Sequence, residues 1–150
     1  MRRPDSQQWR EAKSLGDDGE RLVGEHFARL GWEVTRSVGR ASYDLLLIGR
    51  VEVKTDRRAA QTGNVAVEVS YYGQPSGIHI TTATWWAIVL ADEVVVIRAS
   101  VLREAVLSGR HREASAGDGG AARVRLVPVD ELRRLPGAHH IDLRPEGASW

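Results

Sequence analysis

The chain has 150 residues, 42% of them hydrophobic, which suffices for one domain with a buried core. It contains no cysteine, which excludes disulfides and thiolate metal sites, and its net charge of +1 excludes a uniformly basic nucleic-acid-binding surface. No apolar run reaches transmembrane length and no apolar signal core follows the Arg-rich start, so we expect a cytoplasmic protein.

The first predicted helix runs from about residue 17 to residue 30 and is preceded by a basic N-terminal arm of residues 1–15. Asp17 and Asp18 suit its first turn, and Gly31 ends it. Its apolar stripe contains Val23, Phe27 and Leu30, and Glu20 lies one turn earlier on the same stripe. A carboxylate there is costly unless it is paired or bound to a metal, so Glu20 is a candidate ligand. The alternative is that Glu20 only supports the helix start.

Two strands are predicted on either side of Gly49-Arg50, at residues 43–48 and 51–55. The first is apolar enough to be buried. The second alternates valines with charged residues, so Glu52 and Lys54 share one face while the valines face a core. We expect a hairpin with an odd-length connection or a bulge near residues 42–50, because a regular two-residue loop would point Asp44 away from Glu52.

Lys54 is one of only two lysines beside nineteen arginines, which indicates that it is used for its chemistry. A compact ammonium can orient or deprotonate a water in a way that a guanidinium cannot. Asp44, Glu52 and Lys54 together are the minimal set for metal-dependent phosphodiester cleavage. Taken alone, Glu52 and Lys54 indicate no more than a solvated ion pair on an exposed sheet face.

Further strands are predicted at residues 63–72, 87–91, 94–97 and 123–127, with helices at 100–107 and 129–135. Glu68 is interpreted as a solvated strand carboxylate in preference to a fourth ligand or a neighbour that tunes Lys54. Residues 78–84 offer hydroxyls and backbone donors that can bind a phosphate. Trp85 and Trp86 are assigned to a core or an interface in preference to base stacking.

The C-terminal third gives weaker patterns. Residues 111–122 are glycine-rich and are predicted to form a flexible loop. Residues 123–150 are expected to add a strand, a short helix and a tail to the same domain. His139 and His140 are assigned to that solvated tail, because adjacent side chains of an extended chain point apart and chelate poorly.

Four segments carry a family resemblance: residues 16–21, 31–37, 42–44 and 51–54. Together they resemble the PD-(D/E)XK nuclease superfamily, and within it the small archaeal-type and phage Holliday junction resolvases. The resemblance implies an α/β fold with a restriction-endonuclease-like core (α-β-β-β-α-β), a mixed central sheet and flanking helices, placed here at residues 16–110. Tyr43 replaces the proline of the nominal motif.

The resemblance also implies roles for individual residues. Glu20, Asp44 and Glu52 would surround a magnesium ion, Lys54 would act on the water, and Ser42 would help to position the scissile phosphate. Oxygen ligands in a chain without cysteine likewise favour Mg²⁺ over zinc, and Mn²⁺ is expected to substitute.

The expected function is hydrolysis of branched DNA, such as four-way junctions, by a homodimer. The resemblance implies that the products carry 5′-phosphate ends. A nuclease of the same superfamily acting on linear duplex or single-stranded DNA is one alternative. A nuclease-fold module that binds DNA without cutting it is the other. Four arginines that flank the site in sequence are expected to contact phosphates: Arg36, Arg40, Arg57 and Arg58.

Overall fold

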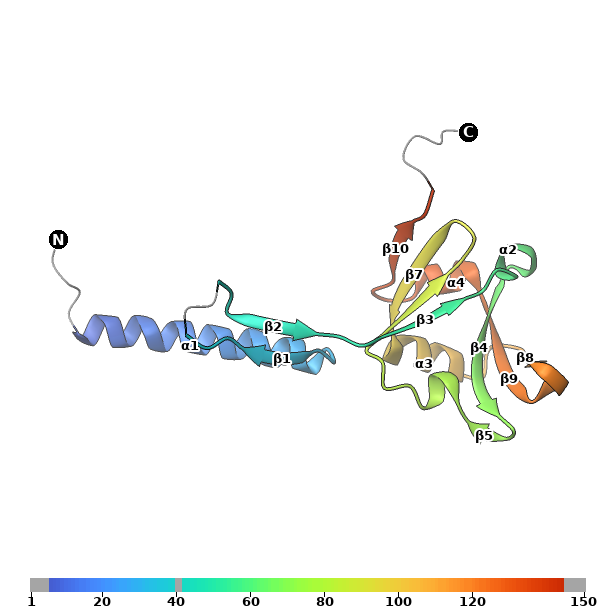
Figure 1. Cartoon of the computed structure of the whole chain (residues 1–150), viewed down its shortest axis with the longest axis horizontal. Coiled ribbons are helices and arrows are strands. Elements are labelled where there is room, and N and C mark those ends of the chain that lie inside the picture. The colour runs from blue at the N-terminus through green and yellow to red at the C-terminus, as the bar shows by residue number, and fades with distance from the viewer. Residues whose placement is uncertain (1–5, 40–41, 145–150) are drawn as a thin grey trace. The chain divides into compact units, whose positions relative to one another are not determined.

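The structure is a computed structural model that describes residues 6–39 and 42–144. The chain divides into two compact units, a first unit of residues Met1–Gly49 and a second unit of residues Arg50–Trp150 (Figure 1). Each unit is described by itself below.

The first unit consists of a long helix and a two-stranded antiparallel sheet. Helix α1 spans Ser6–Arg29, and β1 (Glu33–Arg36) pairs with β2 (Leu45–Ile48). A Cβ at Gly24 would lie 3.5 Å from Val34, so α1 packs closely on the sheet. The expected start at Asp17 is wrong, and residues 6–15 belong to the helix instead of to an arm, because they contain no glycine or proline to interrupt it.

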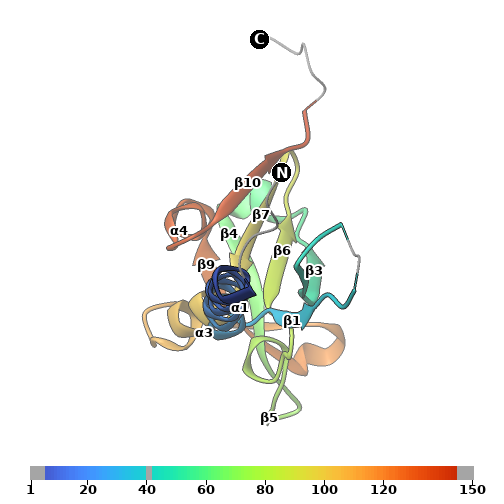
Figure 2. The same ribbon diagram turned by 90° about the vertical axis from the view of Figure 1, so that its left-hand side faces the viewer.

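The second unit contains a mixed four-stranded sheet in the order β10-β7-β6-β3 (Figure 2). Its strands are β3 (Val51–Thr55), β6 (Trp85–Val89), β7 (Glu93–Arg98) and β10 (His139–Asp142). β3 runs parallel to β6, whereas the other neighbours are antiparallel. The expected tail at His139 and His140 is therefore a strand, which lies beside Val95 and Val96 of β7.

A second four-stranded sheet has the order β5-β4-β9-β8 and is antiparallel throughout. It is formed by β4 (Asn64–Tyr71), β5 (Gln74–Pro75), β8 (Glu113–Ala116) and β9 (Ala122–Pro128). The predicted strands at 63–72 and 123–127 are confirmed. The expected flexible loop at 111–122 is wrong, because residues 113–116 extend the sheet along β9.

Short helices connect and cover these sheets: α2 (Ala59–Thr62), the 3₁₀ turn η1 (Gly77–His79), α3 (Ala99–Leu107), the 3₁₀ turn η2 (Asp118–Gly120) and α4 (Val129–Arg134). The predicted helices at 100–107 and 129–135 are confirmed. One core joins both sheets to α3 and α4, with side chains from β4, β6, β7 and β9; its largest fully buried members are Trp86, Ile78, Ile88, Ile97, Leu102 and Leu132.

The chain is thus a mixed α/β protein with a mixed sheet flanked by helices, but the expected hairpin across Gly49-Arg50 is wrong. The ladder partner of β2 is β1 and that of β3 is β6, and the two connecting residues form no turn. Position 49 requires glycine for packing, because a Cβ there would lie 2.9 Å from the ring of Trp32.

Two expectations of burial are also wrong. Val51 and Val53 of β3 are 54% and 60% exposed, because β3 is the end strand of its sheet. In β2, Leu46 and Ile48 are exposed as well, so an all-apolar run did not mark a buried strand.

Candidate functional site

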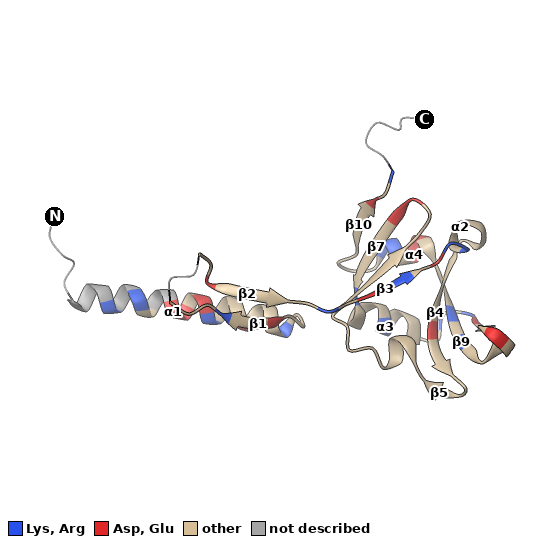
Figure 3. Ribbon diagram, viewed as in Figure 1, with Lys and Arg blue, Asp and Glu red and all other residues tan. Residues whose placement is uncertain are grey.

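Strand β3 presents the two charged residues that the sequence placed on one face. Glu52 and Lys54 form an ion pair of 2.7 Å between carboxylate Oε1 and ammonium Nζ. Figure 3 shows the acidic and basic positions following each other along β3. The two side chains remain 40% and 50% exposed, so the pair is open to solvent and to a ligand.

A pocket of about 510 Å³ lies over this pair in the second unit. One part of its lining comes from β3, through Glu52 and Lys54, and another from Glu68 of β4. The remaining polar lining comes from Arg50 and from the segment that leads into β6, which includes Thr81 and Thr82. The pocket therefore collects two carboxylates, two cations and two hydroxyls from separate elements.

Trp86 forms the floor beneath Lys54. It is 2% exposed, as the assignment to a core predicted, and it is the ladder partner of Glu52 in the parallel β3–β6 pair. The Nζ atom of Lys54 lies 5.8 Å from the centre of the indole ring, within range of a cation–π contact. The ammonium is thus held between a carboxylate and an aromatic face.

Glu68 was expected to be a solvated carboxylate. It is half buried, lines the pocket, and accepts a hydrogen bond of 2.7 Å from the Ser76 hydroxyl. The β4–β9 register shifts between Glu68 and Ser70. Alternation along β4 places Glu68 on the face opposite the buried Val67 and Val69, but it does not state which elements that face meets.

Asp56 fixes the C-terminal end of β3. One carboxylate oxygen accepts from the backbone N–H groups of Arg58 and Ala59, at 3.0 and 3.1 Å, and the other accepts from the N–H of Ala66 in β4, at 3.0 Å. Both oxygens of this carboxylate accept backbone hydrogen bonds, which connect the end of β3 to β4, so the role of Asp56 is structural.

Two of the arginines expected to contact DNA follow Asp56. Arg57 and Arg58 lie at the turn before α2, and neither lines the pocket that holds Lys54. Arg58 lines a different pocket of about 390 Å³ together with Arg112. The cation that does line the Lys54 pocket is Arg50, at the opposite end of β3, which the sequence analysis did not select.

The other predicted site residues belong to the first unit. Glu20 lies on the less exposed stripe of α1, as expected, but its carboxylate accepts a hydrogen bond of 2.6 Å from Arg36. That bond raises the pKa of Arg36. Asp44 and Ser42 are exposed just before β2, and the Asp44 backbone oxygen accepts from Ser37. Arg40 lies outside the described residues.

The donor set of the pocket suits a hard divalent cation. Glu52 and Glu68 supply carboxylate oxygens, which are the ligand type that Mg²⁺ prefers in proteins. Within residues 6–39 and 42–144, no group of three or more acidic or histidine side chains gathers closely enough to hold a metal ion. The two carboxylates of the pocket therefore have the right chemistry for Mg²⁺, but water or phosphate oxygens would have to complete its coordination.

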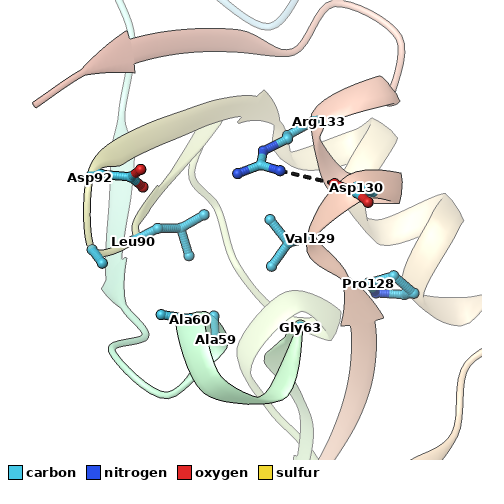
Figure 4. Close-up of a pocket in the computed structure, with 10 residues that line it drawn as sticks. Ala59, Ala60, Gly63, Leu90, Asp92, Pro128, Val129, Asp130 and Arg133 are labelled. Atoms are coloured by element: carbon cyan, nitrogen blue, oxygen red, sulfur yellow. Dashed lines mark hydrogen bonds and ion pairs between the residues drawn. The ribbon is translucent and has the colours of Figure 1, made fainter. Parts of the chain in front are cut away.

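A third pocket, of about 280 Å³, lies between α2, α4 and the β6–β7 connection (Figure 4). Its main cation, Arg133, is engaged by Asp130 at 2.9 Å and by Glu93. Burial raises the pKa of Glu93, but hydrogen bonds from Arg133 and His140 outweigh burial and hold that pKa below its ordinary value. Among the described residues, the only cation that lines this pocket is therefore already engaged by two carboxylates.

Comparison with known protein families, curated proteins and solved structures finds no match to this chain. Within the described part of the chain, no helix has the length and apolar character needed to span a membrane.

Proposed function

We propose that this chain is a metal-dependent DNA endonuclease with a PD-(D/E)XK-type active site. The observation that carries the proposal is the Glu52–Lys54 pair on one face of β3, opening into a pocket that Glu68 also lines. The restriction-endonuclease-like core belongs to the proposal and accords with the observed mixed sheet and flanking helices. The roles that the resemblance implies for Asp44 and Glu20 as further acidic ligands, and for Ser42 in positioning the phosphate, stay predictions from the sequence.

Each side chain has a defined task in the proposed reaction. Lys54 holds a water and assists loss of its proton while the water oxygen attacks phosphorus in line. The bond from phosphorus to the 3′ oxygen breaks, the leaving oxygen gains a proton from solvent, and the products carry 5′-phosphate and 3′-hydroxyl ends. Glu52 orients the ammonium through the 2.7 Å ion pair, and its other carboxylate oxygen would help to hold Mg²⁺. When bound, Mg²⁺ or Mn²⁺ supplies charge stabilisation at the phosphate.

The proposed substrate is branched DNA, in particular the four-way junction, cut by a homodimer. Symmetric cleavage of a junction needs two sites that face related strands, which a two-fold dimer provides. This choice of substrate rests on the sequence resemblance, whereas the chemistry rests on the pocket.

The test is cleavage of a labelled synthetic four-way junction beside linear duplex and single-stranded controls of the same sequences. Each substrate is incubated with Mg²⁺ and, separately, with a chelator. Paired nicks that need Mg²⁺ and are confined to the junction support the whole proposal. Metal-dependent cutting of the linear controls would support the proposed active site but would show that the substrate is linear DNA. Binding without cutting under every condition refutes the endonuclease and favours a non-catalytic DNA-binding module.

A further inference from the structure

The segment from Ser76 to Ala83 forms a wall of the Lys54 pocket and is fixed to β4 at its beginning. Gly77 has φ +54°, and a Cβ there would lie 2.4 Å from the backbone oxygen of Glu68, so this close approach requires glycine. Ser76 donates its hydroxyl to the Glu68 carboxylate, and the His79 ring Nδ1 lies 2.7 Å from the backbone oxygen of Val69.

Arg103 of α3 fixes the later part of the same wall. Its Nε donates to the backbone oxygen of Ile78 at 2.9 Å, and its Nη2 donates to the backbone oxygen of Thr81 at 3.1 Å. One planar guanidinium therefore holds two carbonyls that are three residues apart. These two hydrogen bonds fix the backbone up to Thr81 and so limit the positions that Thr82 can take.

The two threonines of the wall differ in what their hydroxyls do. The Thr81 hydroxyl accepts from the N–H of Ala83 at 3.2 Å and lies 3.4 Å from the Trp86 indole nitrogen. The Thr82 side chain is exposed, and within the described residues its hydroxyl has no hydrogen-bond partner although it lines the pocket. Thr81 is structural, whereas Thr82 is available to a ligand.

Arg50 lies beside this wall. Its backbone oxygen accepts from the N–H groups of Thr84 and Trp85, at 2.9 and 3.0 Å, which places the start of β3 against the end of the wall. Its guanidinium is exposed, lines the pocket, and has no ion-pair partner among the described residues. The other cation of the pocket, Lys54, is already paired with Glu52.

We propose that Arg50 and Thr82 bind one phosphate of the DNA backbone, and that Arg103 is the positioning residue that holds Thr82 at the pocket. The inference rests on the proposed nuclease function and adds the residues that hold the strand beside Lys54. A guanidinium binds phosphate oxygens through paired N–H groups, and a hydroxyl adds a further donor. Contacts of this kind set the register of the DNA backbone without reading its sequence.

The test measures binding of a labelled four-way junction and of linear duplex by fluorescence anisotropy, with chelator present so that no cutting occurs. Arg50→Gln is expected to weaken binding about 10- to 100-fold and to reduce the slope of log K against log salt by about 1. Thr82→Val removes only the hydroxyl and is expected to weaken binding about 3- to 10-fold, whereas Thr82→Ser restores it. Arg112→Gln, an equal change of charge at an exposed arginine of another pocket, is the matched control.

A double-mutant cycle tests Arg103. Arg103→Met is expected to weaken binding as much as Thr82→Val does, and to cost little more when the Thr82 hydroxyl is already absent. Arg103→Lys, which keeps one donor, is expected to restore part of the affinity. Thermal unfolding of each variant confirms that the protein is folded. A purely structural role predicts additive losses in the cycle, and additivity would overturn the assignment of Arg103.

The two hypotheses fail in different ways. If the wild-type protein neither binds nor cuts DNA, the proposed function and this inference both fall. If the wild type binds and cuts while Arg50→Gln and Thr82→Val bind like the control, the nuclease stands and the phosphate site is refuted.

Discussion

Replacement of Lys54 by alanine separates a catalytic role from a structural one, because the structure limits what this side chain can contribute to stability. The pair with Glu52 is half exposed, and an exposed ion pair contributes about 0–1 kcal/mol. The contact with the Trp86 ring adds about 0.5–1 kcal/mol. The free energy of unfolding should therefore fall by at most about 2 kcal/mol, or about 4–8 °C in Tm.

Such a loss leaves the folded fraction almost unchanged, since domains have about 5–15 kcal/mol of stability. Loss of the group that activates water is expected to lower the cleavage rate about 10²- to 10⁴-fold. Single-turnover cutting of the labelled junction in Mg²⁺, together with urea unfolding of the same samples, measures both quantities.

The control is Arg125→Ala, which breaks a 3.0 Å ion pair with Glu113 between β8 and β9, and with it a hydrogen bond to the backbone oxygen of His111. It is expected to lower stability by a comparable amount and to leave the cleavage rate unchanged. Wild-type cutting by Lys54→Ala would refute the role assigned to Lys54, and so would equal loss of cutting in the two variants.

Three further predictions concern other positions. Asp44→Asn is expected to abolish cutting while junction affinity, measured by gel shift, stays within about threefold of wild type; normal cutting would remove Asp44 from the site. Gly77→Ala is expected to destabilise the protein by more than about 1–3 kcal/mol in urea unfolding, because its Cβ would overlap a backbone oxygen of β4. Gly73→Ala, at φ +77° with open space around it, isolates backbone strain, and equal losses in the two variants would exclude the overlap. Burial raises the pKa of Glu93, but hydrogen bonds from Arg133 and His140 outweigh burial and hold that pKa below its ordinary value of 4.5. The stability that Glu93 contributes is therefore complete above pH 4.5, and it is lost as pH falls through the folded-state pKa. The stability difference between wild type and Glu93→Gln should therefore narrow from pH 7 to pH 3, and a constant difference would contradict this.

Features that depend on neighbours in the chain followed from the sequence. The alternation of residues 51–55 was enough to place Glu52 and Lys54 on one face, because successive strand side chains point to opposite sides. The same rule gave β4, and the helices α3 and α4 followed from equally local signals. These features needed no knowledge of what lies across the sheet.

Features that depend on distant partners did not follow. The apolar run of β2 predicted a buried strand and a hairpin, yet its partner is β1, and β3 pairs with β6 from more than 30 residues away. The glycine-rich composition of residues 111–122 predicts a loop, but residues 113–116 pair with β9, and local composition carries no signal of that pairing. Periodicity states which residues share a face, but it does not state what the face meets.

The candidate site shows the same division. Strand geometry and the rarity of lysine were enough to select the candidate pair Glu52 and Lys54 from the sequence. The walls around this pair could not be predicted, because Glu68, Arg50 and Thr82 lie on different elements, which long-range strand pairing and the hydrogen bonds of Arg103 bring together. A strand fixes directions along itself, whereas a pocket requires several elements at fixed separations, and those separations are set by the packing of the core.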